Sequence, residues 1–150
     1  RPPRSTLFPY TTLFRSYDAS NKAIGSTRFQ LPDAYACAVA CCGRDAFLFG
    51  SSVLEILRLC PTDPSRMYVA TPHRFRGKVP DGIIVMDRMK RSETENYEGI
   101  LIERVRQAIL SSQHIIMLDR LLEAADVAAE RGLLDAAQKA STIRELYKND

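Results

Sequence analysis

Apolar residues in the last third of the chain recur every three or four positions, which is the spacing of one helix face. Three stripes carry this period, and each predicts an amphipathic helix with one face on a core. The first stripe is Val105, Ala108 and Ile109; the second is Leu118, Leu121, Leu122, Ala125 and Ala129; the third is Leu133, Ala137, Ala140, Ile143 and Tyr147. Gly132 separates the second stripe from the third, at a point where a glycine can end a helix.

Two shorter helices are expected earlier in the chain. One covers about residues 34–42 and ends at Gly43. The other covers residues 52–60, and its start matches a capping box, in which Ser52 caps the helix while Glu55 reaches back to the Ser52 amide. Prolines follow this second segment and cannot continue a helix.

Between these helical regions the pattern changes to short runs rich in β-branched residues. Residues 67–71 and 82–86 are predicted strands, and the simplest arrangement is an antiparallel pair joined by a long basic hairpin. Residues 99–102 are a third predicted strand, whereas 46–49 and 89–96 are expected to be an apolar link and a polar connector. The predicted fold class is α+β, with two N-terminal helices, a small antiparallel sheet with a basic hairpin, and a helical C-terminal half.

The first residues of the chain do not share this organisation. Residues 6–16 spell TLFPYTTLFRS, which resembles one reading frame of a common DNA sequencing adapter. We interpret residues 1–16 as an artefact of that kind, expected to be disordered, and set them aside from fold arguments. The chain has 21 Lys and Arg against 18 Asp and Glu, and three of the arginines lie in this segment. The net charge of +3 therefore belongs to the artefact.

Charge is unevenly distributed along the remaining residues. Residues 17–91 carry 11 Lys and Arg against 7 Asp and Glu, whereas residues 92–150 carry 7 against 11. The basic excess lies in and after the predicted hairpin, and the candidate binding residues there are His73, Arg74, Arg76, Lys78, Arg88, Lys90 and Arg91. Such a ribbon could contact nucleic-acid phosphates or an acidic protein partner. A solvated loop that aids solubility is the simpler explanation.

Residues that would indicate catalysis or a cofactor are scarce. The sequence has no phosphate-binding glycine loop, dinucleotide fingerprint, zinc-protease motif or nucleophile elbow. Acidic residues three or four apart within 119–130 are interpreted as a solvated helix face, and Glu103 with Arg106 as helix-surface charge. The expected buried, reduced thiols are Cys37, Cys41, Cys42 and Cys60. The sequence thus predicts no catalytic residue, no metal ligand and no cofactor.

Four motifs, in this order, resemble the AbiEi family of antitoxins from type IV toxin–antitoxin systems. They are DAYACAVACCGRDAFLFGSSVLEILRL (33–59), RMYVATPHRFRGKVPDGIIVM (66–86), YEGILIERVRQAIL (97–110) and MLDRLLEAADVAAERGLL (117–134). The resemblance covers most of residues 31–146. It implies that residues 31–150 form an antitoxin domain. It also implies that residues 17–30 are a linker or the remnant of a largely missing, transcription-repressing winged-helix domain.

The resemblance implies a non-enzymatic, cytoplasmic antitoxin of a bacterial abortive-infection system, which counteracts a nucleotidyltransferase-like toxin. Antagonism of the toxin need not involve contact with it, and nucleic acid is a candidate partner of the basic hairpin. Binding of operator DNA is not expected without the winged helix, and no membrane association is expected. Two alternatives stay open. One is a nucleic-acid-binding regulator fragment without a toxin partner; the other is a degenerate nuclease-like domain with Asp81, Asp87 and Lys90 as its candidate residues.

Overall fold

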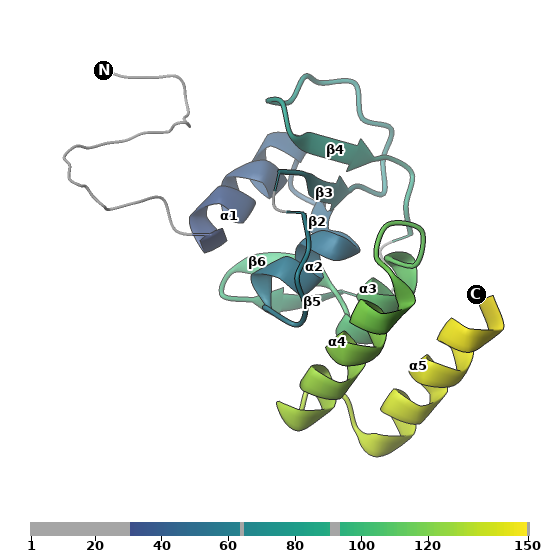
Figure 1. Ribbon diagram of the computed structural model, residues 1–150. Helices are drawn as coiled ribbons and strands as arrows, with labels where there is room; N and C mark the ends of the chain where they lie inside the picture. Colours follow the sequence, from purple (N-terminus) through teal and green to yellow (C-terminus); the bar gives the residue numbers. More distant parts are fainter. Residues whose placement is uncertain (1–30, 64, 91–93, 150) are drawn as a thin grey trace. The chain divides into compact units, whose positions relative to one another are not determined.

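The computed structural model describes residues 31–63, 65–90 and 94–149 (Figure 1). The chain divides into two compact units, Arg1–Ala34 and Tyr35–Asp150, and almost all described residues belong to the second. The interpretations of residues 1–30 as an adapter artefact and a linker or winged-helix remnant lie outside the described residues. So does Arg91 of the predicted binding residues.

The fold is α+β, as the sequence predicts, with a mixed sheet and helices before and after it (Figure 1). The elements are α1 (Leu31–Cys42), β2 (Phe47–Leu48), α2 (Ser51–Ile56), β3 (Met67–Ala70), β4 (Ile83–Met86), β5 (Thr94–Tyr97), β6 (Ile100–Glu103), α3 (Val105–Ser111), α4 (Leu118–Glu130) and α5 (Ala136–Asn149). Among the described residues, no helix is both long and apolar enough to cross a membrane.

The sheet is built around its shortest strand. The strand order is β4-β3-β2-β6-β5, so β2 lies in the centre. The sequence pattern of 46–49 predicted only an apolar link, and that prediction is wrong. Phe47 and Leu48 are almost completely buried, and they pair with β3 in antiparallel and with β6 in parallel orientation. A two-residue strand is too short to show the alternation from which strands are recognised.

The pairing of β3 with β4 is parallel, which corrects the predicted hairpin. Met67 lies opposite Ile83 and Ala70 lies opposite Met86, so both strands run in the same direction. A parallel pair requires a connection long enough to return to the starting edge of the sheet, and residues 71–82 provide it. The prediction of an antiparallel sheet is therefore only partly correct, because β2–β3 and β5–β6 are the antiparallel pairs.

The true hairpin joins β5 to β6, in a region where 89–96 was expected to be only a polar connector. Its strands face each other with Tyr97 opposite Ile100, leaving a two-residue loop of Glu98 and Gly99. Both loop residues have positive φ, 50° and 87°, as a tight type I′ turn requires. The predicted strand around residues 99–102 is confirmed as β6.

The helical stripes are confirmed in α3 and largely in α4. Val105, Ala108 and Ile109 of α3 are all buried. In α4 the buried face contains Leu121 and Ala125 from the predicted stripe. It also contains Ala124 and Ala128, which the stripe omitted, while Leu122 and Ala129 are half-buried.

The buried face of α5 differs from the prediction. Thr142 and Leu146 are fully buried, whereas Tyr147 from the predicted stripe is 60% exposed. Thr142 can be buried because its hydroxyl donates to the Gln138 carbonyl oxygen, 2.7 Å away, inside the same helix. The helix lies alongside α4 and also packs against α3 (Figure 1). Its start is a capping box between Asp135 and Gln138, each accepting the other's backbone amide.

The capping box predicted for the helix after Gly50 is absent from α2. Gly50 occupies the cap position, and Ser52 is already the second residue of the helix. The Ser52 hydroxyl instead accepts the backbone amide of Tyr68 on β3, 2.6 Å away. The Glu55 carboxylate accepts the hydroxyl of Thr62 in the segment after the helix. Both side chains are thus used for tertiary contacts, which the local sequence motif cannot reveal.

Candidate functional site

The two basic segments predicted from the sequence meet at one edge of the sheet. Because β3 and β4 are parallel, the segments that follow them both leave from the carboxyl ends of the strands. Three backbone hydrogen bonds join these segments: Thr71 N to Met86 O at 3.0 Å, Met89 N to Thr71 O at 2.9 Å, and Arg88 N to His73 O at 3.2 Å. An antiparallel hairpin would have placed one basic segment at its tip and the other at its base.

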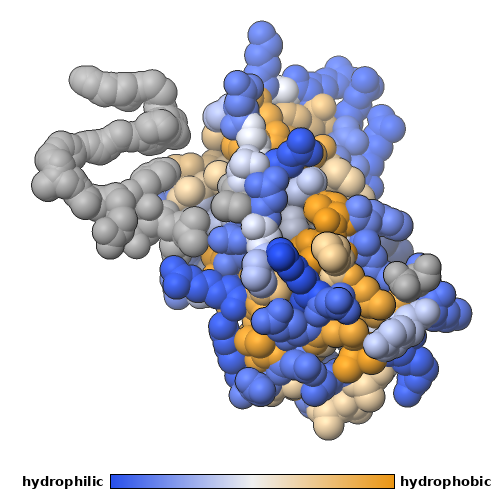
Figure 2. Space-filling view, viewed as in Figure 1, coloured by the Kyte–Doolittle hydropathy of each residue, from blue (hydrophilic) through white to orange (hydrophobic). Residues whose placement is uncertain are grey.

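We call this surface the basic edge, and it comprises His73, Arg74, Arg76, Lys78, Arg88 and Lys90. All six residues are exposed. Figure 2 shows hydrophilic residues gathered over the region of β4 and its neighbouring loops. The backbone contacts bring the start of the first segment, at His73, directly beside Arg88. Arg88 itself has a positive φ of 59°, so the chain turns sharply there.

Acidic side chains anchor the basic edge and offset part of its charge. The Asp45 carboxylate lies 3.3 Å from Nε2 of His73, with both side chains well exposed. The Asp87 carboxylate accepts the backbone amide of Phe75 at 3.3 Å. These contacts orient the start of the loop. In the described part of the chain, no carboxylate lies within 4 Å of the charged groups of Arg74, Arg76 and Lys78.

The nuclease-like alternative is not supported by this geometry. Asp81 precedes β4 and Asp87 follows it, so the two carboxylates flank opposite ends of the strand. Four strand residues alone span about 13 Å, too far for two carboxylates to share one metal ion. In the described part of the chain, no group of three or more His, Cys, Asp or Glu side chains could hold a metal ion.

A buried carboxylate that the sequence analysis missed connects the sheet to two helices. Glu103, the last residue of β6, is only 8% exposed, which corrects its interpretation as surface charge. Its Oε1 accepts the Gly50 amide at 2.9 Å, and its Oε2 accepts the Ser111 hydroxyl at 3.0 Å. Burial raises the pKa of Glu103, while these two hydrogen bonds oppose the rise. Glu103 therefore joins α2 and α3 at the end of the central strands.

The predicted partner of Glu103 has a different role. Arg106 forms an ion pair with Glu145 on α5, with 2.8 Å between the charged atoms. The acidic residues of α4 agree better with the prediction, since Asp119, Glu123, Asp126 and Glu130 are all exposed. Asp126 is bound there by Lys139 of α5 at 2.8 Å.

The four thiols fall into two classes, so the prediction that all are buried is only half correct. Cys42 and Cys60 are buried, and burial raises the pKa of each thiol to about 11. Cys37 and Cys41 are exposed on α1. Thiols with a raised pKa stay protonated near neutral pH and are poor nucleophiles. Cys42 and Cys60 thus behave as core residues.

Comparison of the chain with protein-family models, with curated proteins and with solved structures gave no significant match.

Proposed function

We propose that this chain carries the antitoxin domain of a bacterial type IV toxin–antitoxin system and acts by binding, without catalysis. The four motifs that resemble AbiEi antitoxins lie almost entirely within one compact unit, Tyr35–Asp150. They supply its central strands and the buried faces of α3 and α4. The motifs thus include both core elements and surface loops of this unit, up to the end of α4.

The proposed binding mode is based on the basic edge. The parallel pairing of β3 and β4 brings the start of the loop after β3, at His73, beside Arg88 after β4, and the exposed Arg74, Arg76 and Lys78 follow in the same loop. Exposed arginines present planar donor groups that match phosphate oxygens, and lysines add point charges. Partners with closely spaced phosphates therefore suit this surface better than single anions. We accordingly propose that the basic edge binds nucleic acid, and that it does so at the target on which the toxin acts.

The test is a rescue assay with the full-length protein. Cells arrested by the cognate toxin receive the protein with Arg74→Ala, Arg76→Ala and Lys78→Ala combined. We expect rescue to be lost or strongly reduced while the protein level stays unchanged. A matched control removes three exposed cations from the helical half, Arg104→Ala, Arg144→Ala and Lys148→Ala. Equal rescue by both variants, together with equal affinity for nucleic acid, would exclude this role of the basic edge.

The same surface supports a second candidate function, a nucleic-acid-binding module that acts without a toxin. Binding to a labelled duplex at several salt concentrations measures the contribution of phosphates directly. Each lost phosphate contact should reduce the salt slope by about 0.9, so the triple variant should lower it by about 2 to 3. Normal binding without any rescue of toxin-arrested cells would favour the second candidate over the antitoxin.

A further inference from the structure

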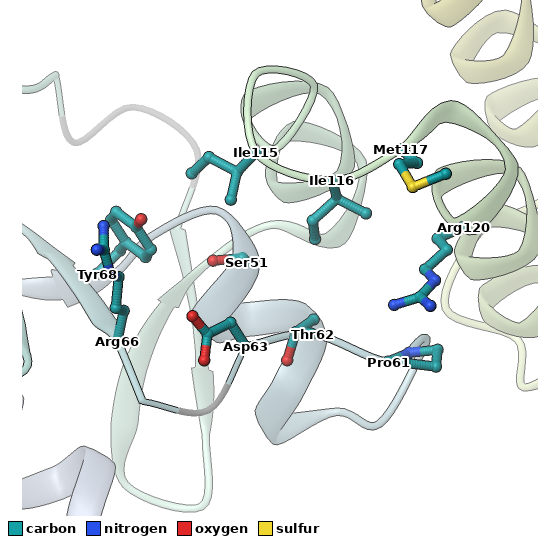
Figure 3. A pocket seen from close by; sticks show the side chains of 10 residues that line it. All are labelled: Ser51, Pro61, Thr62, Asp63, Arg66, Tyr68, Ile115, Ile116, Met117 and Arg120. Carbon is teal, nitrogen blue, oxygen red and sulfur yellow. The ribbon is translucent and has the colours of Figure 1, made fainter.

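A cleft outside the basic edge lies between the connection from α3 to α4 and the segment that follows α2 (Figure 3). Its volume is about 310 Å³. Pockets that bind small organic molecules begin at roughly this size. The apolar side is formed by Ile115, Ile116 and Met117, and the opposite side by the residues around Thr62 and Asp63.

Ser51 gives the clearest sign that something binds in this cleft. The side chain lies in the middle of the cleft (Figure 3), and the residue is only 5% exposed. Its hydroxyl makes no hydrogen bond to any residue that the structure describes, unlike that of its neighbour Ser52, which accepts the Tyr68 amide. A buried hydroxyl without a partner is unfavourable, so such groups usually bind water or a ligand. The Ser51 hydroxyl is therefore available to a molecule in the cleft.

Two arginines approach the cleft from opposite ends, Arg66 from the β3 side and Arg120 from α4 (Figure 3). Neither guanidinium group forms a hydrogen bond or an ion pair with the residues that the structure describes. Asp63 lies between them, but its carboxylate is engaged by the amide and hydroxyl of Ser65 at 3.0 and 2.7 Å. Those two bonds and the nearby Arg66 charge lower the pKa of Asp63, so it stays ionised.

The remaining lining is suited to a flat, apolar group. Ile115 and Met117 are 51% and 70% exposed, so the apolar side of the cleft is in contact with water. The half-buried ring of Tyr68 lies at the same end as Arg66 (Figure 3). A ring system between Tyr68 and Ile115 would cover apolar surface that is otherwise in water. The ionised Asp63 can accept hydrogen bonds from hydroxyl or amino groups of the same ligand.

We propose that this cleft binds a nucleoside monophosphate or a molecule of the same chemistry, with an anionic phosphate at one end and a flat ring at the other. Arg120 holds the phosphate in a bidentate contact, and the Ser51 hydroxyl donates to the ligand at the centre. The ring occupies the end formed by Tyr68, Arg66 and Ile115. This site is independent of the basic edge and of the antitoxin proposal.

The test is isothermal titration of the full chain with AMP, GMP, CMP and UMP, with adenosine and inorganic phosphate as half-ligands. We expect at least one monophosphate to bind about tenfold more tightly than either half-ligand, since both ends of the cleft contribute. Arg120→Gln and Arg66→Gln should each weaken that binding by about tenfold. The matched control Arg144→Gln removes an exposed cation on α5 and should leave the affinity unchanged.

Ser51→Ala separates a binding role from a structural one. The variant loses a hydroxyl that has no partner in the described chain, so thermal unfolding should occur at the same or a higher temperature. Ligand affinity should nevertheless fall by a factor of about 3 to 10. The proposal is overturned if every monophosphate binds no more tightly than inorganic phosphate. It is equally overturned if Arg120→Gln, Arg66→Gln and Arg144→Gln bind alike.

Discussion

The Glu103 junction and the basic edge are built from the same kind of contact in opposite surroundings. In each, a carboxylate accepts a backbone amide from a distant segment: Glu103 accepts Gly50 at 2.9 Å, and Asp87 accepts Phe75 at 3.3 Å. Glu103 is 8% exposed and lies at the end of the central strands. Asp87 is exposed and lies at the rim of the sheet.

The comparison shows that burial, more than the type of contact, decides what a contact does. Water competes for the exposed Asp87 carboxylate, so its bond to Phe75 contributes little to stability. Water cannot replace the partners of Glu103, so losing one leaves a buried polar group unsatisfied. The junction therefore fixes the arrangement of β6, α2 and α3, whereas the basic edge remains available for binding.

The largest effect is expected at Glu103 itself. Glu103→Ala removes both acceptors and leaves the buried Gly50 amide and the half-buried Ser111 hydroxyl without these partners. We expect the free energy of unfolding to fall by about 3 kcal/mol. The matched variant Asp87→Ala should lower it by about 0.5 kcal/mol. Urea unfolding followed by circular dichroism measures both, and similar losses in the two variants would contradict the comparison.

A second, smaller effect is expected at the partner of Glu103. Gly50 has φ 54° and ψ −124°, the conformation of the first central residue in a type II′ turn, and Ser52 N closes that turn on Phe49 O. An added Cβ would meet Ser112 Oγ at 3.6 Å and Ser111 Cβ at 4.0 Å, both ordinary contacts. Gly50→Ala should therefore cost about 2 kcal/mol through backbone strain alone. Gly132→Ala, at φ 78° with no neighbouring atom within 4 Å, should cost about 1 kcal/mol in the same unfolding assay.

Helix α3 and Glu103 illustrate which parts of the fold the sequence could predict and which it could not. The face of α3 followed from the spacing of Val105, Ala108 and Ile109, because helix periodicity is a local property. The role of Glu103 did not, since it depends on Gly50, 53 residues earlier in the chain. The position of Glu103 three residues before Arg106 suggested only an ordinary pair of charges on a helix surface.

The candidate site was predictable in its composition but not in its geometry. Basic residues after both strands were visible in the sequence, yet the direction of β4 relative to β3 was not. A long connection such as 71–82 permits either orientation, and only the packing of the whole sheet selects one. The cleft was missed for a related reason. Its residues come from three separate stretches of the chain, at 51, within 61–68 and within 115–120, and no local motif connects Ser51 with Arg66 and Arg120.

The dependence of stability on pH offers a sharper test of the buried junction. A carboxyl whose pKa is raised in the fold binds its proton more tightly when folded than when unfolded. The ordinary pKa of this carboxyl is 4.5. As pH rises from 4.5 through the raised pKa, the contribution of Glu103 to the free energy of unfolding therefore falls, and above the raised pKa it is constant. Glu103→Gln keeps an acceptor for the Gly50 amide and has no proton to lose.

The glutamine variant should therefore gain stability relative to the native protein as pH rises, and the two should differ least near pH 4. Thermal unfolding at half-unit steps from pH 4 to pH 8 measures this difference. Taking the difference between the two proteins cancels the contributions of other groups, such as Asp63, whose lowered pKa acts in the opposite direction. A constant difference across the range would show that Glu103 titrates as an exposed carboxyl does.

The smallest effect on stability is expected where the proposed function is concentrated. Arg74→Ala, Arg76→Ala and Lys78→Ala together remove three exposed cations without a carboxylate within 4 Å in the described chain. The free energy of unfolding should change by no more than about 0.5 kcal/mol, and with little dependence on salt. The affinity for nucleic acid should fall in the same preparation. If unfolding instead became easier by about 2 kcal/mol or more, these cations would stabilise the fold. Lost rescue in cells could then reflect unfolding, and the basic edge would no longer support a binding function.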